Sequence, residues 1–175
     1  MRWLEDQFLS TRDFMEAGGP LLTWIAITIF LMWLLIVERS LFYRLQMPQL
    51  VADARRKWEA RAERKSWEAH QIRTKLISEV EQESEKWLAV IQTLVALCPL
   101  LGLMGTVTGM IRVFEVMAFA GSGNVRSMAD GVSSATIPTM AGMVGALSGV
   151  LVVTVLTRRS EREVGLLEDS LTMDH

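Results

Sequence analysis

Six glycines in the last two hydrophobic stretches of this chain constrain its fold more than any other feature. They recur every three or four residues, which is the spacing of one helix face: Gly102, Gly105, Gly109, Gly142, Gly145 and Gly149. In lipid the hydrophobic effect does not drive one helix onto another, so small-residue stripes let backbones approach closely and gain van der Waals contact. The pattern predicts helices that pack closely and a chain that assembles within a membrane.

Three long stretches carry no charged residue, namely 21–37, 87–111 and 131–157. About 20 apolar residues cross a bilayer as a helix. In a chain of 175 residues that is 50% hydrophobic, these stretches predict an all-α integral membrane protein with three transmembrane helices. The predicted segments are a periplasmic N-terminal segment (1–20), span 1 (21–37), a cytoplasmic helical extension (38–86), span 2 with its cytoplasmic end (87–118), a periplasmic turn (119–130), span 3 (131–157) and a cytoplasmic tail (158–175).

The first apolar stretch is predicted to be a retained helix and not a cleaved signal. A signal peptide has a basic n-region and a small-residue cleavage site. Here Arg2 and Arg12 are outnumbered by acidic residues, and Glu38 follows the apolar stretch directly. Before it, Leu4 and Phe8 share roughly helical spacing with Met15, which predicts an amphipathic helix at the outer surface.

The orientation follows from the distribution of Lys and Arg between the loops. Segment 38–86 holds eleven of them, and the tail begins with Arg158 and Arg159, whereas the turn at 119–130 holds only Arg126. The positive-inside rule therefore places the long segment and the tail in the cytoplasm, with the N-terminus outside.

The segment from Ala52 to Lys86 is predicted to be a helical stalk. It contains no Gly or Pro and is dominated by Ala, Glu, Lys and Arg. Its apolar residues recur at roughly helical spacing and lead into the second span: Trp58, Ala62, Ile72, Leu76 and Val80. We expect the helix to continue through Trp87 into the bilayer.

The sequence offers no constellation typical of an enzyme or a metal site. His70 lies among charged residues, His175 is the last residue, and neither is grouped with Cys98 in a ligand spacing. The glycines at 102–109 lack the Lys and Ser or Thr of a phosphate-binding loop. We expect no enzymatic activity, no metal, no cofactor and no nucleic-acid partner, and no intrachain disulfide because Cys98 is the only cysteine.

Hydroxyl groups are the polar side chains that remain inside the second and third spans. They belong to Thr106, Thr108, Ser133, Ser134, Thr136, Thr139 and Ser148. None titrates near neutral pH, so a proton carrier would have to come from another chain. Thr106 and Thr139 suit the lining around a partner's acid, and the alternative is that they bond to their own backbone or to a neighbouring helix.

Charged residues and prolines near these spans have structural readings. Arg112 and Glu115 are one turn apart and could pair at the membrane interface. Asp130 opens the third span and could cap it. Pro99 and Pro138 predict kinks, either for packing or for local access of water.

Two motifs resemble the MotA/TolQ/ExbB proton-channel family. The run from Pro99 to Met110, PLLGLMGTVTGM, is similar to the second-span signature of that family, and the segment from Ala129 to Gly142 is similar to its third span. The resemblance implies a ring of subunits, usually a pentamer, around the single membrane helices of ExbD-like or TolR-like partners. Each partner would supply a membrane aspartate, and Thr106 and Thr139 match the pore threonines of the family.

One position departs from the family pattern. Many ExbB and TolQ proteins carry a glutamate three residues after the position of Gly131, and this chain has Ser134 there. Ser134 is therefore a pore-lining candidate without a carboxylate, and no pore glutamate acts at this position.

The resemblance implies an inner-membrane proton-channel subunit that works with a TonB-like protein and most resembles a short ExbB of an auxiliary TonB system. A TolQ-like subunit for envelope integrity is the nearest alternative. A membrane scaffold that does not conduct ions, and that uses the glycines only to oligomerise, is the alternative from a different class. The residues also leave open whether protons or sodium ions pass.

Overall fold

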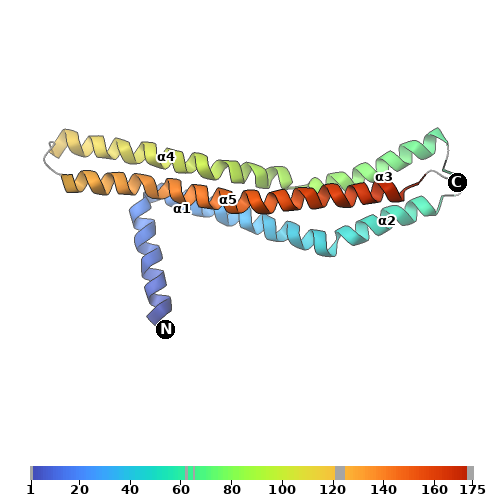
Figure 1. Ribbon diagram of the computed structural model, residues 1–175, viewed down its shortest axis with the longest axis horizontal. Coiled ribbons are helices and arrows are strands. Elements are labelled where there is room, and N and C mark those ends of the chain that lie inside the picture. The colour runs from blue at the N-terminus through green and yellow to red at the C-terminus, as the bar shows by residue number, and fades with distance from the viewer. Residues whose placement is uncertain (1, 62, 65, 121–124, 173–175) are drawn as a thin grey trace. The chain divides into compact units, whose positions relative to one another are not determined.

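The computed structural model describes the backbone of residues 2–61, 63–64, 66–120 and 125–172, and the side chains of 18–61, 63–64, 66–119 and 128–172. The described regular structure is helical: α1 (Arg2–Leu45), α2 (Met47–Glu59), α3 (Trp67–Glu85), α4 (Leu88–Ala120) and α5 (Val125–Ser170), shown in Figure 1. Three stretches are long and apolar enough to cross a membrane: Gly18–Leu45, Trp67–Phe119 and Met128–Ser170. For the described residues, the all-α class with three helices able to span a membrane is therefore confirmed.

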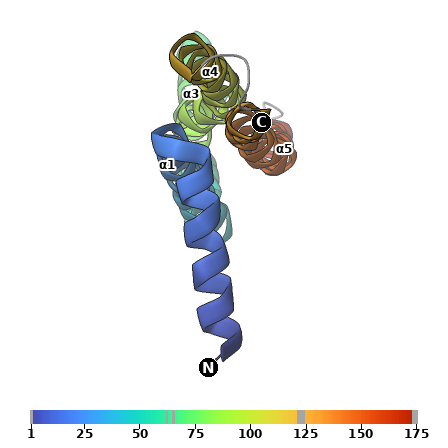
Figure 2. The same ribbon diagram turned by 90° about the vertical axis from the view of Figure 1, so that its left-hand side faces the viewer.

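The chain divides into two units. The first comprises the described residues of 1–33 and 93–150, and the second those of 34–92 and 151–175. In the first unit α4 and α5 lie side by side, and both views show them so (Figures 1 and 2). Three long apolar segments thus meet in this unit, which is where the candidate site lies.

The first helix contains a sharp kink at Gly19. Its backbone has φ 68°, a left-handed conformation that glycine adopts without steric cost. Pro20 follows and begins the second stretch of α1, where its missing N–H costs nothing. The side chains of Leu4, Phe8 and Met15 lie outside the described residues, so the amphipathic character predicted for that segment stays a prediction.

The predicted single stalk is wrong, because two breaks interrupt it. The first separates α2 from α3, which pack against each other. Ser66 caps the start of α3, and its Oγ accepts a hydrogen bond from the Ala69 N–H at 3.1 Å. The second lies between α3 and α4, where Lys86 is extended and Trp87 has φ 69°. Neither break is marked by Gly or Pro, which is why the composition suggested a continuous helix.

The second unit has a core that explains why its helices fold back. Buried apolar side chains come from all of its elements: Phe42, Tyr43, Met47, Ala54, Trp58, Ala69, Leu76, Val80, Leu88, Ile91, Val153, Leu156, Leu167 and Leu171. The Trp58 indole donates to the Thr172 carbonyl at 3.1 Å, and Arg73 Nε donates to the Leu171 carbonyl at 2.9 Å. Because these donors bond to carbonyls at the end of α5, that helix runs unbroken past Thr157 to Ser170.

A buried arginine joins three helices of the second unit at the end of α3. Arg39 on α1 is only 1% exposed, and its Nη2 donates to the carbonyls of Glu83 and, at 3.1 Å, Ser84. The Tyr43 hydroxyl donates to the same Ser84 carbonyl at 2.6 Å, and the Ser84 and Ser160 hydroxyls lie 2.7 Å apart. A cation at a helix C-terminus is favourable because the last carbonyls lack backbone partners.

We expect Arg39→Met to destabilise the protein, because it removes the charged donor from two buried carbonyls. The loss should be about 3 kcal/mol and should lower the melting temperature in detergent by roughly 5–10 °C. Arg44→Met on the exposed side of α1 is the matched control and should change the melting temperature little. An equal drop in both variants would contradict a capping role for Arg39.

Candidate functional site

The faces of α4 and α5 that meet are built from small residues. The glycine positions leave no room for a side chain: an added Cβ at Gly109 would overlap Ala135, and one at Gly102 would lie 2.9 Å from the Thr139 Cα. At Gly142 it would overlap the carbonyl oxygen of Cys98. The two backbones therefore run in close contact along these faces, as small-residue packing in lipid predicts.

Gly145 and Gly149 face other side chains of the first unit. A Cβ at Gly145 would overlap the end of Ile29 on α1, and one at Gly149 would lie 2.6 Å from Met32 Sδ and from a Val95 methyl. All six glycines thus serve packing between helices of one chain. The prediction that the stripes themselves indicate assembly of several copies is not supported by this placement.

Of the three predicted pore residues, only Thr139 links the two helices. Its Oγ1 donates to the Gly102 carbonyl at 2.8 Å, and the side chain is partly buried. Thr106 bonds to the Leu103 carbonyl at 2.7 Å and Ser134 to the Gly131 carbonyl at 2.9 Å, both within their own helix. The local pattern is the usual behaviour of hydroxyls in membrane helices, and Thr139 departs from it.

Pro138, next to Thr139, leaves one backbone carbonyl of α5 without its usual hydrogen bond. Pro138 has no N–H, so the Ser134 carbonyl one turn earlier cannot receive the normal helical bond from it. Pro138 is buried and packs on α4, where a Cβ at Gly105 would lie 2.5 Å from its own Cβ. The Thr139 hydroxyl and the Ser134 carbonyl, which lacks its usual donor, thus lie five residues apart on α5.

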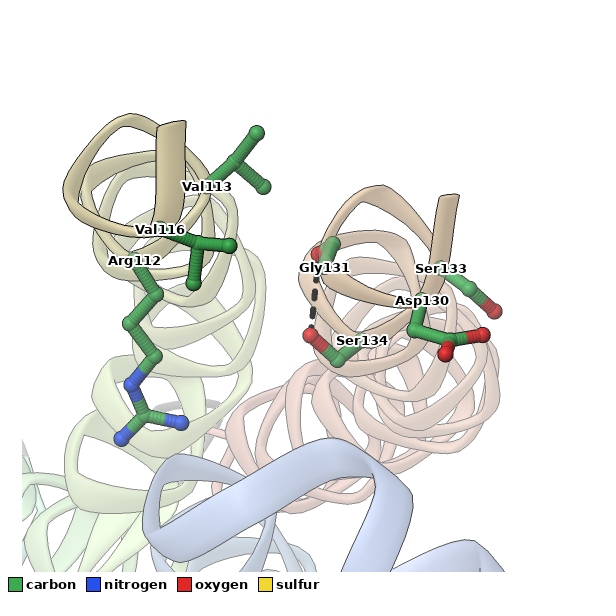
Figure 3. Close-up of a pocket in the computed structure, with 7 residues that line it drawn as sticks. All are labelled: Arg112, Val113, Val116, Asp130, Gly131, Ser133 and Ser134. Carbon is green, nitrogen blue, oxygen red and sulfur yellow. Dashed lines mark hydrogen bonds between the residues drawn. The ribbon is translucent and has the colours of Figure 1, made fainter. Parts of the chain in front are cut away.

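A cavity of about 450 Å³ opens beside the α4–α5 pair, toward the connection between these helices. Figure 3 shows its lining: Arg112, Val113, Val116, Asp130, Gly131, Ser133 and Ser134. The Ser134 hydroxyl lies on the side that faces α4, whereas the Asp130 carboxylate points away from Arg112. Polar side chains from both helices therefore line the cavity at this end of the pair.

Arg112 was not expected to take part in this site. It also lines a smaller neighbouring cavity of about 130 Å³ together with Pro20, Thr108 and Ser134. An added Cβ on Gly19 would lie 3.5 Å from its Nη1, which places the guanidinium beside the kink of α1. The Gly19-Pro20 pair in the sequence indicates a possible break in the helix. It does not indicate that Arg112 lies beside that break.

Two predictions about charged residues at this end are wrong. Arg112 and Glu115 form no ion pair with each other, because the Arg112 side chain turns toward α1. Asp130 does not cap α5, because the helix already starts at Val125. The Arg126 side chain lies outside the described residues.

The outward faces of both helices are strongly apolar. Exposed side chains on α4 and α5 include Leu100, Leu103, Met104, Val107, Met140, Met143, Val144 and Leu147, each 52–68% exposed. Surface of this extent on a single chain must be covered by lipid or by other protein chains.

Titratable acids are absent from the uncharged stretches of this helix pair. Neither 88–110 nor 131–157 contains Asp, Glu or His, and the described residues contain no group of three or more His, Cys, Asp or Glu able to hold a metal. The chemistry that these two stretches can offer is hydrogen bonding by hydroxyls and backbone carbonyls, and they contain no carboxylate of their own to accept a proton near neutral pH.

Comparison with known proteins identifies the same family by a family model and by individual relatives. A family model described as the MotA/TolQ/ExbB proton channel family matches residues 42–169. The chain is 40% identical over 78 residues to the biopolymer transport protein ExbB-like 1 of Synechocystis, an alignment that covers 43% of this chain and 31% of that protein.

Two further relatives carry different names. The identity is 32% over 96 residues to the biopolymer transport protein exbB1 of Vibrio cholerae, which covers 54% of this chain and 42% of the relative. It is 30% over 89 residues to the Tol-Pal system protein TolQ of Pseudomonas aeruginosa, which covers 51% and 38%. The chain thus spans about two fifths or less of the length of the curated relatives that it matches.

Proposed function

This chain belongs to the MotA/TolQ/ExbB proton channel family, and from that premise we propose that it is the channel-forming subunit of a proton-driven complex in the bacterial inner membrane. Copies of the chain form a ring, expected to be a pentamer, around the single membrane helices of ExbD-like partners. Proton flow through the complex energises a TonB-like protein for outer-membrane transport. The role is mechanical and conductive, with no enzymatic step.

The observation that carries the proposal is the Thr139 hydroxyl, which donates across to the Gly102 carbonyl between two stretches without acids, 88–110 and 131–157. With its one proton donated to that carbonyl, the Thr139 oxygen can still accept a hydrogen bond from water or from a partner's protonated carboxyl group, yet it cannot take up the proton itself. The mechanism therefore needs a carboxylate from another chain. A single-span partner with a membrane aspartate supplies that group.

Two further features support the ring and its orientation. The exposed apolar faces of α4 and α5 provide surface for neighbouring copies and for lipid. The excess of Lys and Arg in 38–86 and after Thr157 supports an orientation with these segments and the C-terminus in the cytoplasm and the N-terminus in the periplasm.

The pathway served has two candidates. The Vibrio ExbB and Pseudomonas TolQ relatives are nearly equal in identity and coverage, so a TolQ-like role in envelope integrity stands beside the TonB role. We favour the TonB role because two ExbB-like relatives of Synechocystis also match. A scaffold that does not conduct ions is the candidate from another class.

The first experiment is the native mass of the detergent-purified chain, expressed with and without an ExbD-like partner from the same host. We expect a closed oligomer that retains fewer partner chains than its own copies. As a control, a partner with Asn in place of its membrane aspartate should still assemble but should abolish proton flux in liposomes. A monomer or dimer that ignores the partner would overturn the channel proposal and leave the scaffold.

A further inference from the structure

A second cavity, of about 440 Å³, lies in the second unit and plays no part in the proposed channel. Its lining comes from the end of α1, from α2 and from α5: Tyr43, Met47, Pro48, Val51, Ala52, Arg55, Arg56, Arg159 and Glu163. One side is apolar and the other carries guanidinium groups. The cavity is therefore amphiphilic.

The charge balance of the cavity is positive. Arg56 forms an ion pair with Asp53, which leaves Arg55 and Arg159 against the single carboxylate of Glu163. Among the described residues neither Arg55 nor Arg159 has an ion-pair partner, and both side chains are exposed. Two guanidinium groups are therefore available to an anion, and their planar donor pairs match phosphate oxygens.

The cavity begins at the depth of lipid headgroups. The uncharged stretch of α5 ends at Thr157, so Arg159 lies only about 3 Å beyond it along the helix axis. On α1 the uncharged stretch ends at Val37, which places Tyr43 about 9 Å beyond. The headgroup region extends roughly 5–8 Å beyond each side of the hydrocarbon core, so Arg159 lies within it and Tyr43 lies at its outer edge.

The surface of α1 at this height is still suited to lipid. Leu41 is 51% exposed and Leu45 is 64% exposed, so large apolar side chains continue beyond the uncharged stretch to the start of α2. Acyl chains and a headgroup can then be accommodated at one place, with apolar contact along α1 and charge within the cavity.

We propose that this cavity binds the phosphate of an anionic phospholipid, held between Arg55 of α2 and Arg159 of α5. The phosphodiester accepts hydrogen bonds from both guanidinium groups, and the glycerol backbone and upper acyl chains lie on Met47, Pro48 and Val51. A bound lipid would fasten the junction of α1 and α2 to α5. Basic pockets between membrane helices at the headgroup level recognise lipid headgroups in this way.

The test is a melting-temperature titration of the detergent-purified full chain with phosphatidylglycerol, phosphatidylcholine or inorganic phosphate. Phosphatidylglycerol should raise the melting temperature, and neither of the others should do so at equal concentration. Arg55→Gln/Arg159→Gln should weaken the apparent affinity for phosphatidylglycerol at least tenfold, because about two charge-assisted hydrogen-bond partners are lost.

The matched control is Lys57→Gln/Arg158→Gln, which removes the same charge from α2 and α5 at exposed residues that do not line the cavity. It should keep the affinity of the unmodified chain. An equal loss in both double variants, or an equal response to phosphatidylcholine, would overturn the proposal. An equal effect of inorganic phosphate would show a free-phosphate site, and a change in native mass would show that a second copy occupies the cavity.

These outcomes are separable from a failure of the channel proposal. Ring assembly with the partner is read from native mass and proton flux, and the lipid site from the melting titration. A chain that binds phosphatidylglycerol without assembling would refute the channel alone, and a conducting ring insensitive to phosphatidylglycerol would refute the lipid site alone.

Discussion

Replacing Thr139 by Val should abolish proton flux while leaving the complex assembled. The substitution keeps the branched shape of the side chain and removes the hydroxyl that donates to the Gly102 carbonyl at 2.8 Å. The stability cost of one such hydrogen bond is about 0.5–1.5 kcal/mol, too little to prevent assembly. A carboxylate brought to this place by a partner would lose its polar neighbour, so flux in liposomes should fall at least tenfold.

Two variants separate the hydroxyl from the general polarity of α5. Thr139→Ser keeps the donor and should retain most of the flux. Thr136→Val removes a hydroxyl that bonds only to the Ser133 carbonyl of its own helix, at 3.0 Å, and should have little effect. Flux that survives Thr139→Val with the complex intact would refute the assigned role and favour the scaffold. Native mass, measured on each sample, distinguishes loss of conduction from loss of assembly.

The sequence was sufficient to locate the three apolar helices, because each span leaves a long stretch without charge. It did not give their ends. Residues after Thr157 are charged and suggested a separate tail, yet α5 continues to Ser170 because Arg73 and Trp58 bond to carbonyls at its end. Such partners are distant in the chain, so local composition carries no sign of them.

The break between α3 and α4 also depends on contacts between residues distant in the chain, but here a helix ends earlier than its composition predicts. Composition favoured one helix through Lys86 and Trp87, but the Ser84 carbonyl is bonded by Arg39 and Tyr43 on another helix. Tertiary contacts at the end of α3 thus accompany a change of backbone that helix propensity does not favour. Arg39 makes one of these contacts because it is buried. The sequence does not reveal this burial, because Arg39 is one of eleven Lys and Arg residues in segment 38–86.

The candidate site was predictable in kind and not in geometry. Glycine spacing identified the faces that pack, but spacing does not say which helix each face meets. In the structure four of the six glycines lie at the α4–α5 contact, Gly145 lies against Ile29 of α1, and Gly149 lies against both Met32 of α1 and Val95 of α4. The position of Arg112 depends on the kink at Gly19, a long-range relation. The pore assignment of Thr106, Ser134 and Thr139 stays a prediction that flux measurements must test.

Gly142→Ala, which adds a single methyl group, should destabilise the α4–α5 pair more than larger substitutions at most exposed residues would. A Cβ there would overlap the Cys98 carbonyl oxygen and lie 3.4 Å from the Gly102 Cα. Both are backbone atoms, which cannot rotate away as a side chain can, so the helices must separate. Overpacking of this kind costs about 1–3 kcal/mol and should lower the melting temperature in detergent by several degrees.

Two further glycines in α5 make this a graded test. Gly145→Ala would meet only the flexible end of Ile29 and should cost less, and Gly165→Ala would meet nothing within 4 Å and should gain up to about 1 kcal/mol in helix propensity. The expected order of melting temperatures is therefore lowest for Gly142→Ala, then Gly145→Ala, then the unmodified chain and Gly165→Ala. A melting temperature of Gly142→Ala equal to that of Gly165→Ala would mean that α4 and α5 do not meet at this glycine. Because separation of the helices also lengthens the bond from Thr139 to Gly102, Gly142→Ala should lose flux even where the ring persists.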